Sequence, residues 1–250
     1  EYCDPNNDGF GPFNLTDAIA EIVGGAVPPG VQVSFYETAT GAQLGGTQNL
    51  LTSPYTNIDP WTQTIYVRVF YTLTNCANFV ELQLIVNPTP EATEPQPYHE
   101  CDNDYDGFTI FDLSTINAEV LGSIDPTTHT VLYYTTLAAA QIGDPANAIS
   151  NVTNYNSDDQ TIYVRVTTTA TGCFDIVALQ LVVDPLPTSM QPAYAPYSLC
   201  ETTAFGVGFE SFNLLSQVPT ILNGQTGVAV TFYPSLSEAQ SGTNVIPTSS

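Results

Sequence analysis

Two short acidic loops contain the residues best suited to binding an ion. Each carries oxygen side chains at loop positions 1, 3 and 5 and a glycine at position 6, the first half of an EF-hand-type calcium loop. Position 7 offers a backbone carbonyl, and a residue downstream must replace the usual Glu of position 12, with Glu21 and Glu119 as alternatives for that role. We therefore expect Ca²⁺ in both loops; a plain Asx turn without metal is the other interpretation. The expected ligands are Asp4, Asn6, Asp8, Phe10 and Asn14, and Asp102, Asp104, Asp106, Phe108 and Asp112.

The five cysteines predict disulfide bonds, because no CxxC and no Cys/His grouping accompanies them. One scheme pairs them within repeats, Cys3 with Cys76 and Cys101 with Cys173. A second scheme pairs Cys76 with Cys101 and Cys173 with Cys200 across the linkers. We expect the first, since a seven-strand sandwich is expected to begin at the end where the turn before its last strand lies, whereas the next repeat starts about 35 Å away. Unpaired buried thiols are the remaining alternative. Disulfides predict an extracellular or periplasmic location.

The charge balance limits the classes of partner. The chain has 2 Lys plus Arg against 25 Asp plus Glu, a formal net charge of −23. Such a surface cannot neutralise phosphates, so we expect no nucleic acid. No apolar run approaches the ~18 residues of a membrane span, so we expect no membrane insertion. The two cations, Arg68 and Arg165, occupy the same point of a repeated strand, and we expect each to form a structural ion pair or a hydrogen-bonded clamp to a carboxylate. No nucleophile elbow, HExxH or phosphate loop is present, and we expect no enzyme.

The chain repeats one segment three times, which decides its organisation. The copies begin at Cys3, Cys101 and Cys200, a period of 101 − 3 = 98 and 200 − 101 = 99 residues. A later block, QTIYVRV, starts at Gln63 and Gln160, and the third copy stops before reaching it. We expect a longer natural chain or a partner strand to supply what this copy lacks. The third copy also lacks the loop carboxylates and is expected to bind no metal.

Strand patterns dominate each copy. The segments TIYVRVFYT and VELQLIV are rich in β-branched and aromatic residues and predict a closing hairpin, and VQVSFYE predicts an earlier strand. Short helices are expected at 16–23 and 114–121, capped in the first case by Thr16, with a further turn at LAAAQ and LSEAQ. The fold class predicted is all-β: tandem immunoglobulin-like β-sandwich repeats of about 98 residues, joined by proline-rich, semi-rigid linkers. The expected boundaries are repeat 1 at 1–90, a linker at 91–98, repeat 2 at 99–187, a linker at 188–198 and a truncated repeat 3 at 199–250.

As a set, the motifs CDxNxDGFxxFDL, VTFYxTxxxAQ, QTIYVRVxxxxTGC and VNPxP resemble the tandem repeats of giant cell-surface proteins of Bacteroidetes. The resemblance covers essentially all of residues 3–250. Those proteins are exported by type IX secretion and include gliding-motility-associated adhesins and surface filaments. The resemblance implies an extracellular stalk or filament serving adhesion, motility or prey capture, with other copies of the protein and host, prey or surface glycans as partners. The alternative is a carbohydrate-binding module array attached to a secreted hydrolase, which needs aromatic side chains in a solvent-facing row.

Overall fold

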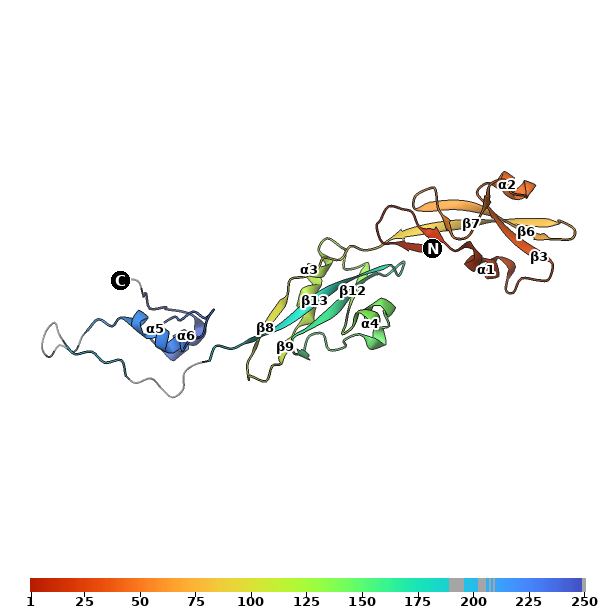
Figure 1. The fold of residues 1–250 in the computed structure, drawn as a ribbon. Coiled ribbons are helices and arrows are strands. Elements are labelled where there is room, and N and C mark those ends of the chain that lie inside the picture. The colour runs from red at the N-terminus through yellow and green to blue at the C-terminus, as the bar shows by residue number, and fades with distance from the viewer. Residues whose placement is uncertain (189–195, 202–205, 207, 209, 249–250) are drawn as a thin grey trace. The chain divides into compact units, whose positions relative to one another are not determined.

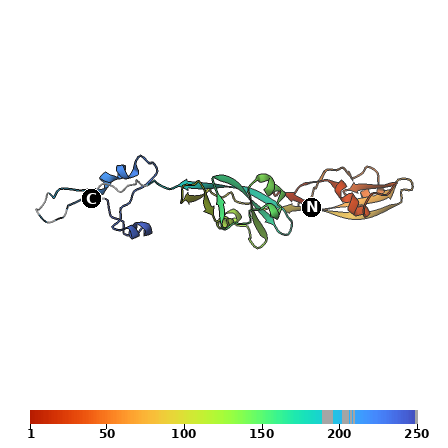
Figure 2. The same ribbon diagram turned by 90° about the horizontal axis from the view of Figure 1, so that it is seen from below.

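The fold was obtained as a computed structural model, which describes residues 1–188, 196–201, 206, 208 and 210–248. Most of the predicted linker at 188–198 lies outside the described residues. The chain divides into two compact units. Figure 1 and, turned by 90°, Figure 2 draw the helices and strands. The first holds residues 1–100 and 107–183, and therefore most of the first two repeats; the second holds residues 101–106 and 184–250.

Repeat 1 is a β-sandwich of a five-stranded sheet and a two-stranded sheet. The large sheet has the order β1-β7-β6-β3-β4 and the small one pairs β2 with β5. Two short helical segments follow β2, and a third helix follows β3. The elements are β1 (Tyr2–Asp4), β2 (Pro12–Phe13), η1 (Leu15–Ala18), α1 (Ile19–Val23), β3 (Val31–Tyr36), α2 (Ala39–Leu44), β4 (Leu50–Leu51), β5 (Tyr55–Thr56), β6 (Thr62–Tyr71) and β7 (Ala77–Pro88).

Repeat 2 has the same plan, with the sheet order β10-β12-β13-β8 and a second sheet of β9 and β11. The prediction of an all-β chain of tandem sandwich repeats is thereby confirmed. The elements are β8 (Tyr98–Asp102), β9 (Thr109–Phe111), η2 (Leu113–Ile116), α3 (Asn117–Leu121), β10 (His129–Tyr134), α4 (Leu137–Ile142), η3 (Pro145–Asn147), β11 (Tyr155–Ser157), β12 (Gln160–Thr168) and β13 (Phe174–Pro185).

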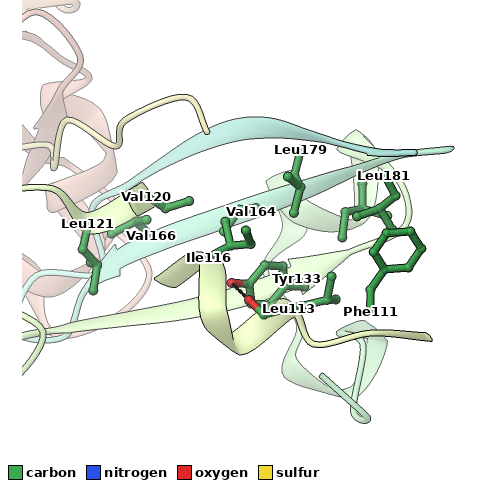
Figure 3. Close-up of a cluster of buried hydrophobic side chains, with 11 residues drawn as sticks. Phe111, Leu113, Ile116, Val120, Leu121, Tyr133, Val164, Val166, Leu179 and Leu181 are labelled. Carbon is green, nitrogen blue, oxygen red and sulfur yellow. Dashed lines mark hydrogen bonds between the residues drawn. The ribbon is translucent and has the colours of Figure 1, made fainter. Parts of the chain in front are cut away.

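The core of each sandwich follows from strand alternation. Ile162, Val164 and Val166 are two residues apart on β12, so they face the same side and are fully buried there. They belong to one buried cluster with Leu179 from β13 and Phe111 from the small sheet, and Figure 3 draws this cluster. A matching cluster forms in repeat 1 around β6.

A tyrosine ties the sheet of repeat 2 to its helical segment. Tyr133 Oη lies 2.7 Å from the Leu113 carbonyl oxygen, a hydrogen bond drawn in Figure 3, and 2.7 Å from Asn117 Oδ1. Burial raises the pKa of the Tyr133 hydroxyl well above its usual value, and the nearby Asp112 raises it further. Phe35 holds the equivalent buried position in repeat 1.

The helical segment after β2 begins earlier than expected. It starts as a 3-10 helix at Leu15, and its N-cap is Asn14 rather than Thr16. In repeat 2 the cap is Asp112, whose carboxylate accepts from the Ser114 main-chain nitrogen.

Arg165 clamps helix α4 onto the sheet. Because β12 alternates, Arg165 points away from the face of Val164 and Val166, toward α4. Its Nη1 donates to the carbonyl oxygens of Ala140 at 2.7 Å and Gln141 at 3.1 Å, in the last turns of that helix.

Arg68 does the same in repeat 1. Its Nη1 donates to the carbonyl oxygens of Ala42 at 3.0 Å and Gln43 at 3.2 Å, and its Nη2 donates to Asn75 Oδ1 at 3.0 Å. The predicted ion pair is therefore wrong: within the described part of the chain, no carboxylate pairs with either arginine. The carbonyls at the end of a helix carry partial negative charge and take the place of the carboxylate.

Gly143 makes room for this clamp. It ends α4 with φ +71°, and a Cβ at this position would lie 2.6 Å from the Arg165 guanidinium carbon. Both the left-handed backbone and the close approach require glycine.

The third copy has helical segments but no strand among its described residues. These segments are η4 (Leu214–Gln217), α5 (Val218–Leu222) and α6 (Leu236–Ser241). In the first two repeats the strand before α2 or α4 pairs with the QTIYVRV strand. The third copy as given contains no such segment, and none of its described residues before α6 pairs as a strand.

Replacing Tyr133 with Phe should destabilise repeat 2 by about 1–2 kcal/mol near neutral pH, through loss of its hydrogen bonds. A raised folded-state pKa stabilises the fold below the ordinary tyrosine value of 10.0, and this stability is lost as pH rises above it. The difference between wild type and Tyr133→Phe should therefore shrink above about pH 10. This difference in the free energy of unfolding is measured by hydrogen exchange of the β12 amides in urea, after the free thiols have been blocked. Tyr163→Phe is the control, and a difference that stays constant with pH contradicts the prediction.

Replacing Arg165 with Gln should lower the free energy of unfolding of repeat 2 by about 3 kcal/mol, because buried carbonyls lose a charged donor. Arg165→Lys should lose about half as much, since it keeps the charge but lacks the planar fork. Exchange of β12 amides reports repeat 2, and Arg68→Gln provides the same change in repeat 1. A loss below about 0.5 kcal/mol in both Arg165 variants would show that the clamp contributes no stability.

Candidate functional site

A disulfide bond joins the first two repeats. Cys3 in β1 is bonded to Cys173, with an S–S distance of 2.06 Å, a Cα–Cα distance of 5.4 Å and a sequence separation of 170 residues. Cys173 lies in the turn between β12 and β13 and is fully buried, whereas Cys3 is exposed. The bond therefore connects the first strand of one repeat to the closing hairpin of the next.

This bond shows that the expected pairing within repeats is wrong, and that the alternative pairing across the linkers is wrong as well. Cys3 is not bonded to Cys76, Cys101 is not bonded to Cys173, and the alternative of Cys173 with Cys200 fails as well. The reason is the position of β1, which pairs in parallel with the last residues of β7 and sets Cys3 opposite Asn87. Cys76 precedes β7, eleven residues before Asn87, so it lies about 36 Å away along the strand. The first strand thus starts at the end of the sandwich where the chain leaves.

The linker between the repeats is bonded to repeat 2. The main-chain nitrogen of Ala92 donates to Asp175 Oδ2 at 3.0 Å, at the start of β13. The main-chain nitrogen of Thr93 donates to the Val120 carbonyl oxygen at 2.9 Å. Ala92 packs against the core of repeat 2, and Pro95 is buried. The proline-rich segment is therefore an extended arm packed on repeat 2 rather than a separate spacer.

Asn7, which sequence reasoning did not single out, holds the start of this arm. Its Oδ1 accepts from the Thr89 main-chain nitrogen at 2.9 Å, and its Nδ2 donates to the Thr89 carbonyl oxygen at 3.2 Å and to Glu91 Oε1 at 3.1 Å. Asn7 has φ 54°, a conformation that asparagine tolerates well. The sequence signal that could have indicated this role is an asparagine in the middle of a turn rich in Asp and Asn.

The first acidic loop is held together by its own hydrogen bonds. Asp4 is fully buried, and its oxygens accept from the main-chain nitrogens of Asn6 and Gly9 at 3.2 and 2.7 Å. Asn6 Nδ2 donates to Asp8 Oδ2 at 2.8 Å, and the Phe10 main-chain nitrogen donates to Asp8 Oδ1 at 2.8 Å. The predicted ligands Asp4, Asn6 and Asp8 therefore lie close together. The carboxylates of Asp4 and Asp8, however, already accept hydrogen bonds from main-chain nitrogens and from the Asn6 amide.

The second loop brings three carboxylates together. One oxygen from each of Asp102, Asp104 and Asp106 lies within 4.8 Å of the others, a spacing at which they could hold a metal ion. Asp102 is buried and accepts from the main-chain nitrogens of Asp104 and Tyr105 at 3.2 and 2.7 Å. Repulsion from Asp106 raises the pKa of the exposed Asp104 carboxyl. Such repulsion is what a bound cation would relieve.

The downstream candidates have other partners. Asn14 Oδ1 accepts from Thr16 Oγ1 at 2.8 Å and from Ser53 Oγ at 2.7 Å. Asp112 caps η2. The Phe10 and Phe108 rings are 39% and 45% exposed, so neither side chain contributes to a core.

The aromatic residues that recur between repeats are mostly internal. Tyr36 and Tyr134 are 2% and 0% exposed, and Tyr66 and Tyr163 are half-buried. Tyr36 donates to the Gly46 carbonyl oxygen at 3.2 Å. These rings therefore do not form a solvent-facing row.

No helix in the described part of the chain has the length and apolar character needed to span a membrane.

In the comparison with curated proteins, no protein matched the chain. The family model of the Flavobacterium inter-domain disulphide bond domain (FIDD) matches three times, at residues 1–90, 97–187 and 196–250. These matches span nearly the whole chain and agree with a bond that crosses between repeats. The chain therefore belongs to the Flavobacterium inter-domain disulphide bond domain family.

Proposed function

We propose that this chain is a structural and adhesive repeat module of a large secreted cell-surface protein or filament, which serves attachment to surfaces or cells and has no enzymatic activity. The observation that carries the proposal is the Cys3–Cys173 disulfide. A catalytic domain needs a positioned reactive group, whereas this covalent link acts on the chain as a mechanical element.

The disulfide changes the path that a pulling force takes through the chain. A force applied at Glu1 reaches Cys3 two residues later, crosses the S–S bond to Cys173 and continues along β13. Residues 4–172 form a closed covalent loop and carry no tension. Unfolding them would otherwise lengthen the chain by about 600 Å. A stalk or filament that holds a cell to a surface needs this resistance to extension.

The proposed secreted location follows from the same disulfide bond. Disulfide bonds persist in oxidising compartments, so a module that depends on one belongs outside the cytoplasm. Closing a loop of this length also restricts the unfolded chain, by about 5 kcal/mol in the chain-entropy model. The membership in an inter-domain disulphide family and the resemblance to Bacteroidetes surface repeats support export, which we propose occurs by type IX secretion.

The buried tyrosines favour this proposal over a carbohydrate-binding array. Sugar platforms require exposed rings, and Tyr36 and Tyr134 lie inside the sandwich instead. The partners proposed are other copies of the protein in a filament or bundle, with host, prey or surface glycans as the attached material.

We further propose that the second acidic loop binds Ca²⁺ through Asp102, Asp104 and Asp106. Calcium prefers clustered carboxylate and carbonyl oxygens, and three carboxylates from alternate residues provide them. The first loop is a weaker candidate, because Asn6 stands where the second loop has the carboxylate of Asp104, which leaves two carboxylates instead of three.

Single-molecule stretching of the 250-residue chain, tethered at its two ends, tests the mechanical proposal. The oxidised chain should show no extension from residues 4–172. Reduction, or Cys173→Ser, should release about 600 Å more, because the load then runs through both repeats.

Cys76→Ser is the matched control and should extend like the wild type, since Cys76 takes no part in the bond. If the oxidised chain already extends by the full length of both repeats, the module does not bear load in the proposed way.

Calcium should raise the melting temperature of the chain, and Asp104→Asn should abolish the rise. Because Asp106 raises the pKa of Asp104, the ionised pair destabilises the metal-free loop, and Asp104→Asn should itself melt slightly higher than wild type without metal. The calcium effect should weaken as pH falls through the pKa of Asp104. Thermal melts with CaCl₂ and with EDTA measure both effects.

Asp158→Asn removes one exposed acidic charge outside the loop and is the control. If calcium raises the melting temperature equally in wild type and in Asp104→Asn, the effect comes from the net charge of −23 rather than from this loop.

A further inference from the structure

A three-residue insertion in repeat 1 presents the only tryptophan of the chain. The glutamine of each QTIYVRV segment donates to a tyrosine hydroxyl, Gln63 to Tyr55 at 2.9 Å and Gln160 to Tyr155 at 3.2 Å. These equivalent pairs are 63 − 55 = 8 and 160 − 155 = 5 residues apart, so the connection in repeat 1 is three residues longer. Trp61 lies in this longer connection, directly before β6, and is 40% exposed.

One face of the Trp61 indole rests on Gly9. A Cβ added at Gly9 would lie 3.1 and 3.2 Å from Cε2 and Cδ2 of Trp61, the two carbons that the indole rings share. These central carbons are approached over the face of the ring, so the exposed part of Trp61 is its other face and its edges. The same Cβ would lie 2.9 Å from Pro60 Cβ, and Gly9 has φ +85°, so only glycine fits beneath the ring.

The main chain holds this ring in an uncommon conformation. Trp61 has φ 68°, which bulky residues rarely adopt. Its nitrogen donates to the Gly9 carbonyl oxygen at 2.9 Å, and its carbonyl oxygen accepts from the Val86 nitrogen at 2.8 Å. Nδ2 of the buried Asn57 donates to the carbonyl oxygens of Gly9 at 2.9 Å and Asp59 at 2.7 Å. The exposed ring is therefore fixed in place, which lowers the entropy cost of binding to it.

Repeat 2 shows that the fold does not require this ring. Counting back from the shared glutamine, Asp158 holds the place of Trp61. The nitrogen of Val183, which corresponds to Val86, donates instead to Asp159 Oδ1 at 2.6 Å. A shorter connection without an aromatic side chain thus supplies the same kind of acceptor. An exposed ring in a strained conformation that the sandwich does not need indicates a role in binding.

The charges around the platform select the kind of ligand. The chain has no Lys, and its two arginines are only 5% and 9% exposed, so no Lys or Arg side chain is presented to an anion. The exposed Asp8 and Asp59 directly precede Gly9 and Pro60, which contact or underlie the ring. Carboxylates accept hydrogen bonds from hydroxyl groups and repel anions. A neutral pyranose suits both features, because its C–H face packs on an apolar ring while its hydroxyls donate to acceptors.

We propose that Trp61 is the platform on which this chain binds a neutral glycan, with Asp8 and Asp59 as acceptors at its edge. The inference deepens the proposed function and rests on it, because it names the residue that contacts the attached material. One ring in one repeat is a single contact rather than an array, so the dissociation constant should be millimolar. Many chains in a filament or bundle then provide the overall affinity by multivalency.

Fluorescence tests the proposal directly, because Trp61 is the only tryptophan and its emission reports this site. The oxidised 250-residue chain is titrated with cellotetraose, chitotetraose and mannotetraose up to about 20 mM. At least one of them should shift the emission to shorter wavelength and reduce acrylamide quenching about twofold, since the sugar covers the ring face that water reaches. Heparin and polygalacturonate should do neither, because both are polyanions.

Two variants separate binding from folding. Trp61→Gly removes the ring and adopts the positive φ freely, so the Cys3–Cys173 bond should form and the melting temperature should not fall. Saturation-transfer NMR should then lose the sugar signal that the wild type gives. Leu73→Gly is the matched control, because Leu73 is 96% exposed just beyond the other end of β6, and it should keep the signal.

Four results would overturn the inference. They are an emission that no neutral sugar changes, a sugar signal that persists in Trp61→Gly, an emission that responds to hexalysine alone, and an emission that changes with protein concentration as a dimer sediments. The third assigns the platform to a cationic partner and the fourth to a second copy of the chain. All four leave the extension of the oxidised chain under load unchanged, so they are distinguishable from failure of the mechanical proposal.

Discussion

The parallel pairing of β1 with the end of β7 is the constraint on which the joint between repeats depends. Three residues of β1 meet the last three of β7, so the chain enters and leaves repeat 1 at the same end. This places Cys3 beside the next repeat rather than beside its own hairpin. A longer β1, or one paired antiparallel, would carry the cysteine away from the junction. One short strand pairing therefore decides that the disulfide crosses between repeats.

The acidic loop and the proline-rich arm act together at this junction. The Asn7 side chain accepts a hydrogen bond from the main-chain nitrogen of Thr89, and Thr89 Oγ1 donates to the Asp4 carbonyl oxygen at 2.8 Å. Beyond this point the arm is bonded to Asp175 and Val120 of repeat 2. The loop that resembles a metal site in repeat 1 is thus also a structural support for the linker. Repeat 2 has Tyr105 at the position of Asn7 and a third carboxylate in its loop, so the two copies have diverged in what this turn holds.

The two arginines show how a chain with a net charge of −23 uses its few cations. Each lies on the outer face of the central strand and donates to carbonyls at the end of a short helix. Burial lowers the pKa of the Arg165 guanidinium, yet arginine remains charged at neutral pH because its ordinary value is so high. Arg165 also stacks on Phe174, the residue after Cys173, with the guanidinium carbon 3.3 Å from the ring centroid. The clamp and the disulfide therefore act on the same hairpin.

The sequence alone determined the repeat period, the all-β class, the closing hairpins and the position of both arginines, because strand alternation and turn residues act over short distances. It also placed three carboxylates of one loop close together, since alternate residues of a tight turn converge. Tertiary structure alone decided the partner of Cys3, the packing of the linker and the carbonyl partners of Arg68 and Arg165. Periodicity shows which cysteines are equivalent, but it is equally compatible with a bond inside a repeat and a bond to the next one. Only the direction in which β1 pairs with β7 distinguishes them, and a strand of three residues carries no pattern from which that direction can be read.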